Sequence, residues 1–160
     1  MVRPEAWDEM DEFGLSSPAF GDGGRIPARY GHDEANVNPP LRIEGVPSSA
    51  TVLALVMDDP DALEPTGTVW THWTVWNVDP GTTEIPEDWD AADATEGEND
   101  FGERGYGGPN PPDRTHTYRL RLYALDARLD LPPGASAADL EAAMADHVLA
   151  EARLTGTYSP

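Results

Sequence analysis

The chain has 160 residues and no cysteine, which excludes disulfide frameworks, thiolate metal sites and cysteine nucleophiles. Asp and Glu number 30 against 10 basic residues, all of them Arg, and the formal net charge of −20 disfavours binding to nucleic acid or to anionic lipid. No apolar run approaches the roughly 20 residues that span a bilayer, so we do not expect an integral membrane protein.

Composition and the N-terminal residues predict a cytoplasmic protein with one domain over residues 1–160. Residues 1–15 lack the basic and apolar regions of a secretory signal, and residues 1–16 are polar enough to form an N-terminal arm over the core. The acidic surplus, without Lys or Cys, is typical of the acidic proteome of a halophilic microbe. An acidic partner-binding surface would give the same composition.

Two segments predict central strands. Residues 51–57 form a continuous apolar run of strand length, which indicates a strand buried on both faces and ending at Asp58 and Asp59. Residues 69–78 are rich in Trp, Thr and Val and close with a turn, which predicts a second central strand.

The next two segments predict loops. Residues 83–105 are strongly acidic without hydrophobic periodicity, which indicates a solvated acidic loop, with at most a short helical turn near residues 89–94. Residues 106–112 hold too many Gly and Pro for a regular element and predict an irregular, rigid loop.

The last third predicts a strand, a helix and a final extended tail. Residues 115–126 alternate between apolar and polar side chains, which is typical of a strand with one core face. Residues 136–151 are Ala-rich with apolar side chains at helical spacing and Ser136 as N-cap, so we expect a helix there that carries His147. Residues 152–158 resemble a strand.

Polar side chains occupy positions where these strands would otherwise hold apolar ones. Asp59 lies where a buried strand stops, His72 lies among Trp residues, and His116 and Tyr118 take the first inward positions of the third strand. Buried polar groups at adjacent strand ends indicate a binding site. Each also has a simpler explanation: Asp59 could build a turn around Pro60, and His72 could be a hydrogen-bonded core histidine.

Several kinds of chemistry have no support in the motifs. The chain has no nucleophile elbow, phosphate-binding loop, dinucleotide fingerprint or zinc-protease motif. Two His and two Asp could reach a metal only from three separate segments without a close pair of histidines, which is a weak signal. We therefore expect no metal and no cofactor.

Three blocks resemble the phosphatidylethanolamine-binding protein family, in its bacterial and archaeal Raf-kinase-inhibitor-like branch. The blocks are Asp59-Pro60-Asp61-Ala62, then Trp70-Thr71-His72-Trp73 with Val75 and Asn77, and then Gly105 to Pro112 followed by His116-Thr117-Tyr118. They are similar to D-P-D-A-P, W-x-H-W-x-V-x-N and G-Y-G-G-P-x-P-P…H-R-Y in that family. The chain departs from these patterns at Leu63, Asn110 and Thr117, where the family has Pro, often Cys, and Arg.

The resemblance implies a mainly β fold with a large antiparallel sheet, a smaller sheet and a C-terminal helix beside a small pocket. It also implies that an anion-binding pocket for phosphoryl or carboxylate groups is lined by Asp59, Trp70, His72, Gly108, Pro111, His116 and Tyr118. Ring nitrogens of the histidines, the Tyr118 hydroxyl and the backbone near Gly107 and Gly108 could donate to an oxyanion there. Asp59 would orient a histidine and keep it protonated.

These observations favour a non-enzymatic protein that binds a small phosphorylated or carboxylated ligand. One alternative is a phosphatase-like hydrolase in which His72 is the base and Asp59 orients it, although no Ser or Cys nucleophile lies in the three blocks. Another is an interaction module that regulates a partner kinase or protease. A protein partner and a homodimer both stay open.

The charge predicts a salt-dependent stability. At low ionic strength a net charge of −20 destabilises the folded state through self-repulsion, which molar salt screens beyond about 3 Å. Thermal unfolding from low to molar KCl should therefore show a steep rise in Tm. A flat profile would contradict the halophilic interpretation.

Overall fold

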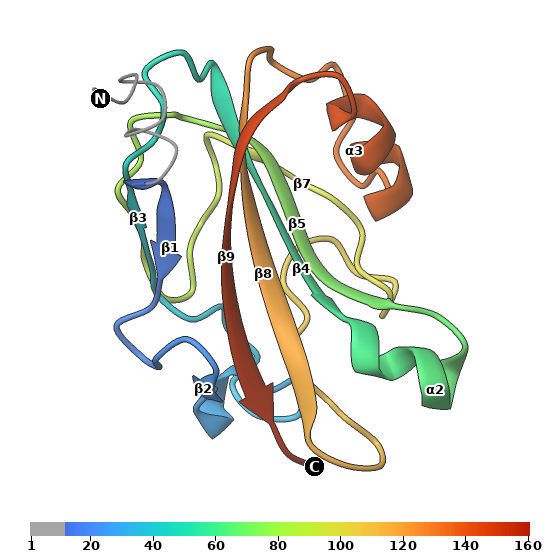
Figure 1. Cartoon of the computed structure of the whole chain (residues 1–160). Helices are drawn as coiled ribbons and strands as arrows, with labels where there is room; N and C mark the ends of the chain where they lie inside the picture. The colour runs from blue at the N-terminus through green and yellow to red at the C-terminus, as the bar shows by residue number, and fades with distance from the viewer. Residues whose placement is uncertain (1–11) are drawn as a thin grey trace, which may run out of the picture.

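The computed structural model describes residues 12–160, which form a large and a small β-sheet and a C-terminal helix (Figure 1). The large sheet contains, from edge to edge, β2 (Gly24–Arg25), β9 (Val148–Tyr158), β8 (His116–Leu125), β4 (Val52–Asp59), β5 (Trp70–Val78) and β7 (Thr95–Glu96). The small sheet contains β1 (Gly14–Ser16), β3 (Leu41–Glu44) and β6 (Glu84–Ile85). The helices are η1 (Ala28–Tyr30), η2 (Pro60–Ala62), α2 (Leu63–Thr66) and α3 (Ala137–Met144).

The large sheet is antiparallel except for the short parallel pairing of β2 with β9. Figure 1 shows the small sheet and α3 on opposite sides of it. This mainly β architecture, with two sheets and a C-terminal helix, is the one expected from the sequence, and the expectation is confirmed. Among residues 12–160, no helix has the length and apolar character needed to cross a membrane.

Two hydrophobic clusters bury both faces of β4. Leu53, Leu55 and Met57 pack in the cluster between the two sheets. Val52, Ala54 and Val56 pack in a second cluster with Leu140 of α3 and Trp76 of β5. The apolar run at residues 51–57 therefore has no polar positions because neither face of this strand meets solvent.

The predicted strand positions agree with β4, β5 and β8 to within two residues. On β8 the alternation is maintained: His116, Tyr118, Leu120, Leu122 and Ala124 are all buried. Residues 106–112 form an irregular loop, as predicted.

The predicted helix over residues 136–151 is wrong at its C-terminal half. Ser136 does cap the helix, since its hydroxyl accepts a hydrogen bond from the Asp139 amide at 3.1 Å. The helix ends at Met144, however, and β9 begins at Val148, so His147 lies between the two elements. Val148 continues the helical spacing of apolar residues but is exposed, because pairing of this segment with β8 overrides helix propensity.

Two other predicted segments are also corrected. The acidic loop at residues 83–105 contains β6 and β7, and it buries Ile85, Ala91 and Asn99. Residues 89–94 form a turn and no helix. Of the predicted N-terminal arm, residues 1–11 lie outside the described part, while Gly14–Ser16 belongs to the small sheet as β1.

Asp58 and Asp59, which end β4, point to opposite faces of the large sheet. On the α3 side, both Asp58 carboxylate oxygens accept hydrogen bonds from Arg119, at 2.6 and 3.1 Å, and one of them accepts another from Arg121 at 2.8 Å. Asp58 is buried, and its carboxylate holds the pKa of Arg119 above its ordinary value. Asp59 points to the opposite face of the large sheet, where the candidate site lies.

Loss of the Asp58 carboxylate should destabilise the fold strongly. Breaking a buried ion pair leaves charges without their partner, so Asp58→Ala should lower the free energy of unfolding by about 3 kcal/mol. Urea unfolding measures this. Asp126→Ala removes the same charge from an exposed carboxylate that pairs with His147, and it should stay within about 0.5 kcal/mol of the unchanged protein. Equal effects of the two changes would contradict this account of Asp58.

Candidate functional site

The candidate site lies where three neighbouring strands have their ends at one edge of the large sheet. β4 runs toward this edge and ends at Asp59, whereas β5 and β8 begin there at Trp70 and His116. Asp59 and Trp70 are register partners in the β4–β5 pair. Strand alternation places Asp59, His116 and Tyr118 on the same side of the sheet. His72 joins them at a register shift of the β4–β5 pair, where it has no register partner on β4.

A cavity of about 200 Å³ opens at this edge. Its lining residues are Asp59, Thr66, Trp70, His72, Phe101, Asn110, Pro112 and Tyr118. Four of the seven residues predicted for the site therefore line it: Asp59, Trp70, His72 and Tyr118. The other three, Gly108, Pro111 and His116, lie next to it without forming its wall.

His72 is 2% exposed. It is held by the irregular loop of residues 106–112, which we call the glycine loop. Its Nδ1–H donates to the Gly107 carbonyl oxygen at 2.7 Å, and the Gly107 amide donates to the His72 carbonyl oxygen at 2.8 Å. Because a carbonyl can only accept, this contact places the proton of the neutral ring on Nδ1 and leaves Nε2 as an acceptor. Burial lowers the pKa of His72, and it outweighs the opposing effects of the Gly107 carbonyl and the Asp59 carboxylate.

Two buried donors in the cavity wall have no partner. Within residues 12–160, neither the Trp70 Nε1–H nor the Tyr118 hydroxyl makes a hydrogen bond of normal geometry, although the Tyr118 hydroxyl lies near the Asp59 carboxylate and the Asn110 backbone. Burial, and next the nearby Asp59 carboxylate, raise the pKa of Tyr118 far above its ordinary value, so the phenol keeps its proton. A buried donor without a partner costs about 1–3 kcal/mol, so both groups are available to donate to a molecule in the cavity.

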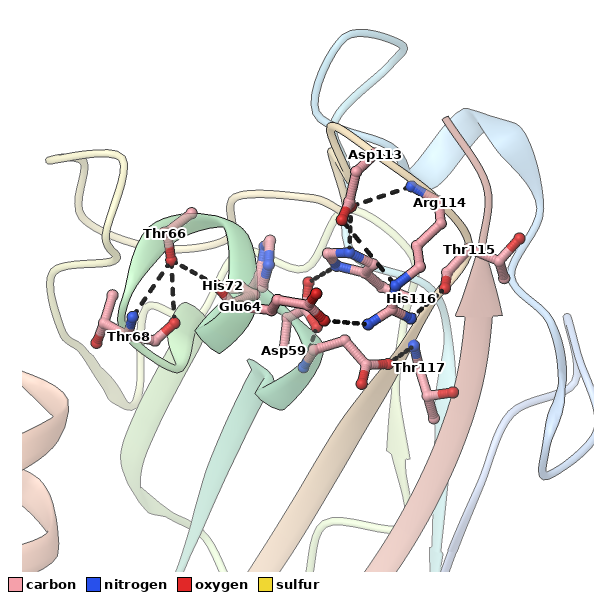
Figure 2. A network of polar contacts seen from close by, with 12 residues as sticks. Asp59, Glu64, Thr66, Thr68, His72, Asp113, Arg114, Thr115, His116 and Thr117 are labelled. Carbon is pink, nitrogen blue, oxygen red and sulfur yellow. Dashed lines mark hydrogen bonds and ion pairs between the residues drawn. The ribbon is translucent and has the colours of Figure 1, made fainter.

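His116 lies behind the cavity, between two carboxylates (Figure 2). Its Nδ1–H donates to Asp59 at 2.5 Å and its Nε2–H donates to Asp113 at 2.7 Å. Burial lowers the pKa of His116, but the hydrogen bonds and charges of the two carboxylates outweigh it and raise the pKa overall. The histidine that Asp59 binds is therefore His116. The hydrolase alternative, in which Asp59 orients His72, does not agree with this contact.

Asp59 also shapes the chain after β4. Its Oδ1 accepts a hydrogen bond from the Asp61 amide at 2.9 Å, which caps η2 at Pro60. The simpler explanation of this residue, a turn around Pro60, is thus correct as well, because one oxygen caps the turn while the other binds His116.

The glycine loop supports the site from outside the cavity. The Gly108 amide donates to the Asn36 side-chain oxygen at 2.8 Å, and a Cβ on Gly108 would lie 2.1 Å from the Tyr30 carbonyl oxygen. Because the amides of Gly107 and Gly108 both donate to protein atoms, the expectation that this backbone approaches an oxyanion is corrected. Pro111 borders a separate hollow of about 490 Å³ between residues 25–34 and the end of β9.

Phe101 is a cavity residue that sequence reasoning missed. Its ring contacts His72 and Trp70 edge-on and stacks on His32, with ring centroids 4.0 Å apart and planes at 15°. The Asn99 side chain fixes this turn, since its oxygen accepts from the Phe101 amide at 2.9 Å. Periodicity could not identify Phe101, because the acidic loop has none.

Thr66, Asn110 and Pro112 also line the cavity without having been singled out for it. The Thr66 hydroxyl already donates to the Ala62 carbonyl at 2.7 Å. Thr117, by contrast, is exposed on the opposite side of β8, as its place in the alternation predicts. In the described part of the chain, no three His, Cys, Asp or Glu side chains are grouped so that they could hold a metal ion.

Comparisons with known proteins agree with this architecture. A family model described as phosphatidylethanolamine-binding protein matches residues 16–159. A UPF0098 protein from Methanothermobacter thermautotrophicus is 49% identical over 149 residues, which cover 90% of this chain and 97% of that protein.

Two solved structures have the same fold. CT736 from Chlamydia trachomatis, described as a homologue of phosphatidylethanolamine-binding protein, superposes with a TM-score of 0.88 at 36% identity, covering 93% of this chain and 98% of that chain. YbcL from E. coli, described as a new member of the mammalian family, superposes with a TM-score of 0.85 at 30% identity, covering 93% and 99%. The chain belongs to the phosphatidylethanolamine-binding protein family.

Proposed function

We propose that the protein is a non-enzymatic binder of a small anion, a phosphoryl or carboxylate group, which it holds in the 200 Å³ cavity. The observation that carries the proposal is the pair of buried donors, Trp70 Nε1–H and the Tyr118 hydroxyl, which have no partner within residues 12–160 and border the same cavity. An oxyanion accepts from both donors at once. The family is named for a phosphorylated lipid headgroup, which fits this chemistry.

The charges around the cavity are compatible with an anion although Asp59 is one of its walls. The His116 imidazolium lies 2.5 Å from the Asp59 carboxylate and 2.7 Å from that of Asp113, so it offsets one of their two negative charges. The Asp113 side chain is 40% exposed, and solvent screens its charge. His72 supplies a positive charge to the bound anion, because its Nε2 gains a proton when a negative group lies beside it. The anion thus interacts with two neutral donors and one histidine that becomes charged on binding.

The hydrolase alternative gains no support from the hydrogen bonds. Asp59 binds His116, and His72 binds a backbone carbonyl, so no carboxylate orients His72 as a base. The Thr66 hydroxyl is already bonded to Ala62. We expect no turnover of phosphoesters or peptides that disappears in His72→Ala. Regulation of a partner enzyme, the Raf-kinase-inhibitor-like assignment and the cytoplasmic location stay predictions.

Removing one buried donor should separate ligand binding from stability. Tyr118→Phe deletes a hydroxyl that has no protein partner, so the free energy of unfolding should stay equal or rise. Affinity for phosphoethanolamine should fall about tenfold or more, since one hydrogen bond to a charged group is lost. Calorimetric titration and urea unfolding measure the two effects.

Tyr123→Phe is the matched control for this change, because Tyr123 lies on the same strand and packs on the α3 side. It should leave affinity unchanged. If Tyr118→Phe and Trp70→Phe both bind phosphoethanolamine as tightly as the unchanged protein, the anion proposal is wrong.

The low pKa of His72 predicts a pH-dependent affinity. Burial keeps the ring neutral in the free protein, and an anion beside Nε2 raises the pKa, so binding takes up a proton and strengthens as pH falls. Sulfate keeps its charge across pH 5 to 9 and removes titration of the ligand. Between the pKa of His72 in the free protein and its raised pKa in the complex, sulfate affinity should fall by up to about tenfold per pH unit.

Calorimetry in buffers of different ionisation enthalpy should report the matching proton uptake. His147→Gln changes an exposed histidine that pairs with Asp126, and it should leave the slope in place. An affinity that is independent of pH, with no proton uptake, would exclude His72 as the group that charges.

A further inference from the structure

His116 connects two chain segments that both contribute residues to the cavity lining. One is the end of β4, which supplies Asp59, and the other is the loop before β8, which supplies Asp113. The His116 side chain is fully buried, and both of its ring nitrogens meet carboxylate oxygens. Because ionised carboxylates only accept, both ring nitrogens must carry a proton, and the ring is an imidazolium.

Both segments contribute residues to the cavity lining. Asp59 and Thr66 come from the end of β4 and the short helices after it, and Asn110 and Pro112 come from the loop before β8. Asp113 directly follows two consecutive prolines, whose rings fix φ and so limit how far Asn110 and Pro112 can move independently of Asp113. Holding Asp113 therefore restrains the part of the lining that this loop supplies.

A second contact ties the loop to the same segment but is too exposed to replace the first. Arg114 lies 3.6 Å from Glu64 of α2, and both side chains are at least half exposed. Exposed ion pairs of this kind contribute little. Figure 2 shows Asp113 and Asp59 on either side of the His116 ring, with Arg114 and Glu64 nearby.

We propose that Asp113 is a positioning residue: through the His116 imidazolium it holds the loop of residues 110–113 toward Asp59 and so sets the width of the anion cavity. This inference rests on the proposed function, because it concerns access to the same cavity. It adds a residue that would contact no ligand itself. It also gives a physical reason why the anion cavity would open or close.

The charged and titratable groups that face His116 define the conditions in which this contact exists. They are Asp59 of β4, Asp113 of the loop and Tyr118 of β8, with Asp61 of η2 and Arg114 nearby. The two carboxylates raise the pKa of His116, and the histidine lowers the pKa of Asp113 despite the opposing effect of burial. The contact is therefore complete between these two titrations.

The charges of these groups determine how the contact between His116 and Asp113 is lost at high pH and at low pH. As pH rises through the raised pKa of His116, one ring nitrogen loses its proton and faces a carboxylate lone pair. The Asp113 side chain is 40% exposed and that of Asp59 only 4%, so Asp113 turns to solvent and releases the loop. At strongly acidic pH, protonation of Asp113 has the same result.

The test uses Asp113→Asn and Asp113→Ala, with Asp126→Asn as matched control. Asp126 also pairs with a histidine, His147, at 2.8 Å, but outside the cavity. In the ligand-free protein, NMR follows the His116 ring signals and the Asn110 and Thr115 amide signals across pH. Calorimetry then gives sulfate affinity at pH 6, which the anion proposal requires to be measurable.

The expected result has three parts. Asp113→Asn should shift the His116 titration to lower pH, move the Asn110 amide signal at pH 6 toward the position it reaches in the unchanged protein at high pH, and weaken sulfate binding about 2- to 10-fold. Asp113→Ala should do the same at least as strongly. Asp126→Asn should change none of these.

The outcomes distinguish this inference from the proposed function. If His116 titrates unchanged in Asp113→Asn, or if the loop signals move while sulfate affinity does not, Asp113 does not position the cavity. If the unchanged protein binds neither sulfate nor phosphoethanolamine while the His116 and loop signals still respond to Asp113→Asn, the contact is real and the anion function fails.

Discussion

The burial of β4 on both faces constrains the rest of the structure. One cluster packs between the sheets and the other under α3, so a slip by one residue would move every side chain of the strand into the wrong cluster and exchange the faces of Asp58 and Asp59. Its last two residues are consequently sent to opposite faces. Asp58 forms an ion pair with two arginines on the α3 side, and Asp59 reaches His116 on the other.

Two buried histidines a few ångströms from the same tyrosine have opposite electrostatic environments. His72 donates to a neutral carbonyl and its pKa is lowered, whereas His116 lies between two carboxylates and its pKa is raised. Their roles differ accordingly. His116 is charged while both carboxylates hold it, and this charge orders the framework. Under the proposed function His72 is neutral until a ligand binds, which places the variable charge in the cavity itself.

The sequence predicted the central strands because their patterns come from burial, and it predicted four cavity residues because the family motifs lie on those strands. It could not show that Gly108 supports the site from outside the cavity, since its hydrogen bond to Asn36 is a long-range contact. It could not show the contact of Asp113 with His116 either, because that contact depends on the irregular loop before β8 and has no periodic signature. Phe101 lies in a loop with no pattern at all. The helix over residues 136–151 was predicted too long because an Ala-rich segment with spaced apolar residues is compatible with either a helix or an edge-side strand, and only pairing with β8 decides.

The reciprocal hydrogen bonds between His72 and Gly107 have a consequence for how charge enters the molecule. With Nδ1–H held by the carbonyl, the only ring position that can gain a proton is Nε2, so the proton must come from the cavity side. Under the proposed function, a singly charged anion and one proton that bind together add no net charge. A protein with a formal charge of −20 would then bury such an anion without increasing the repulsion that its own surface creates, since what enters is in effect the neutral acid.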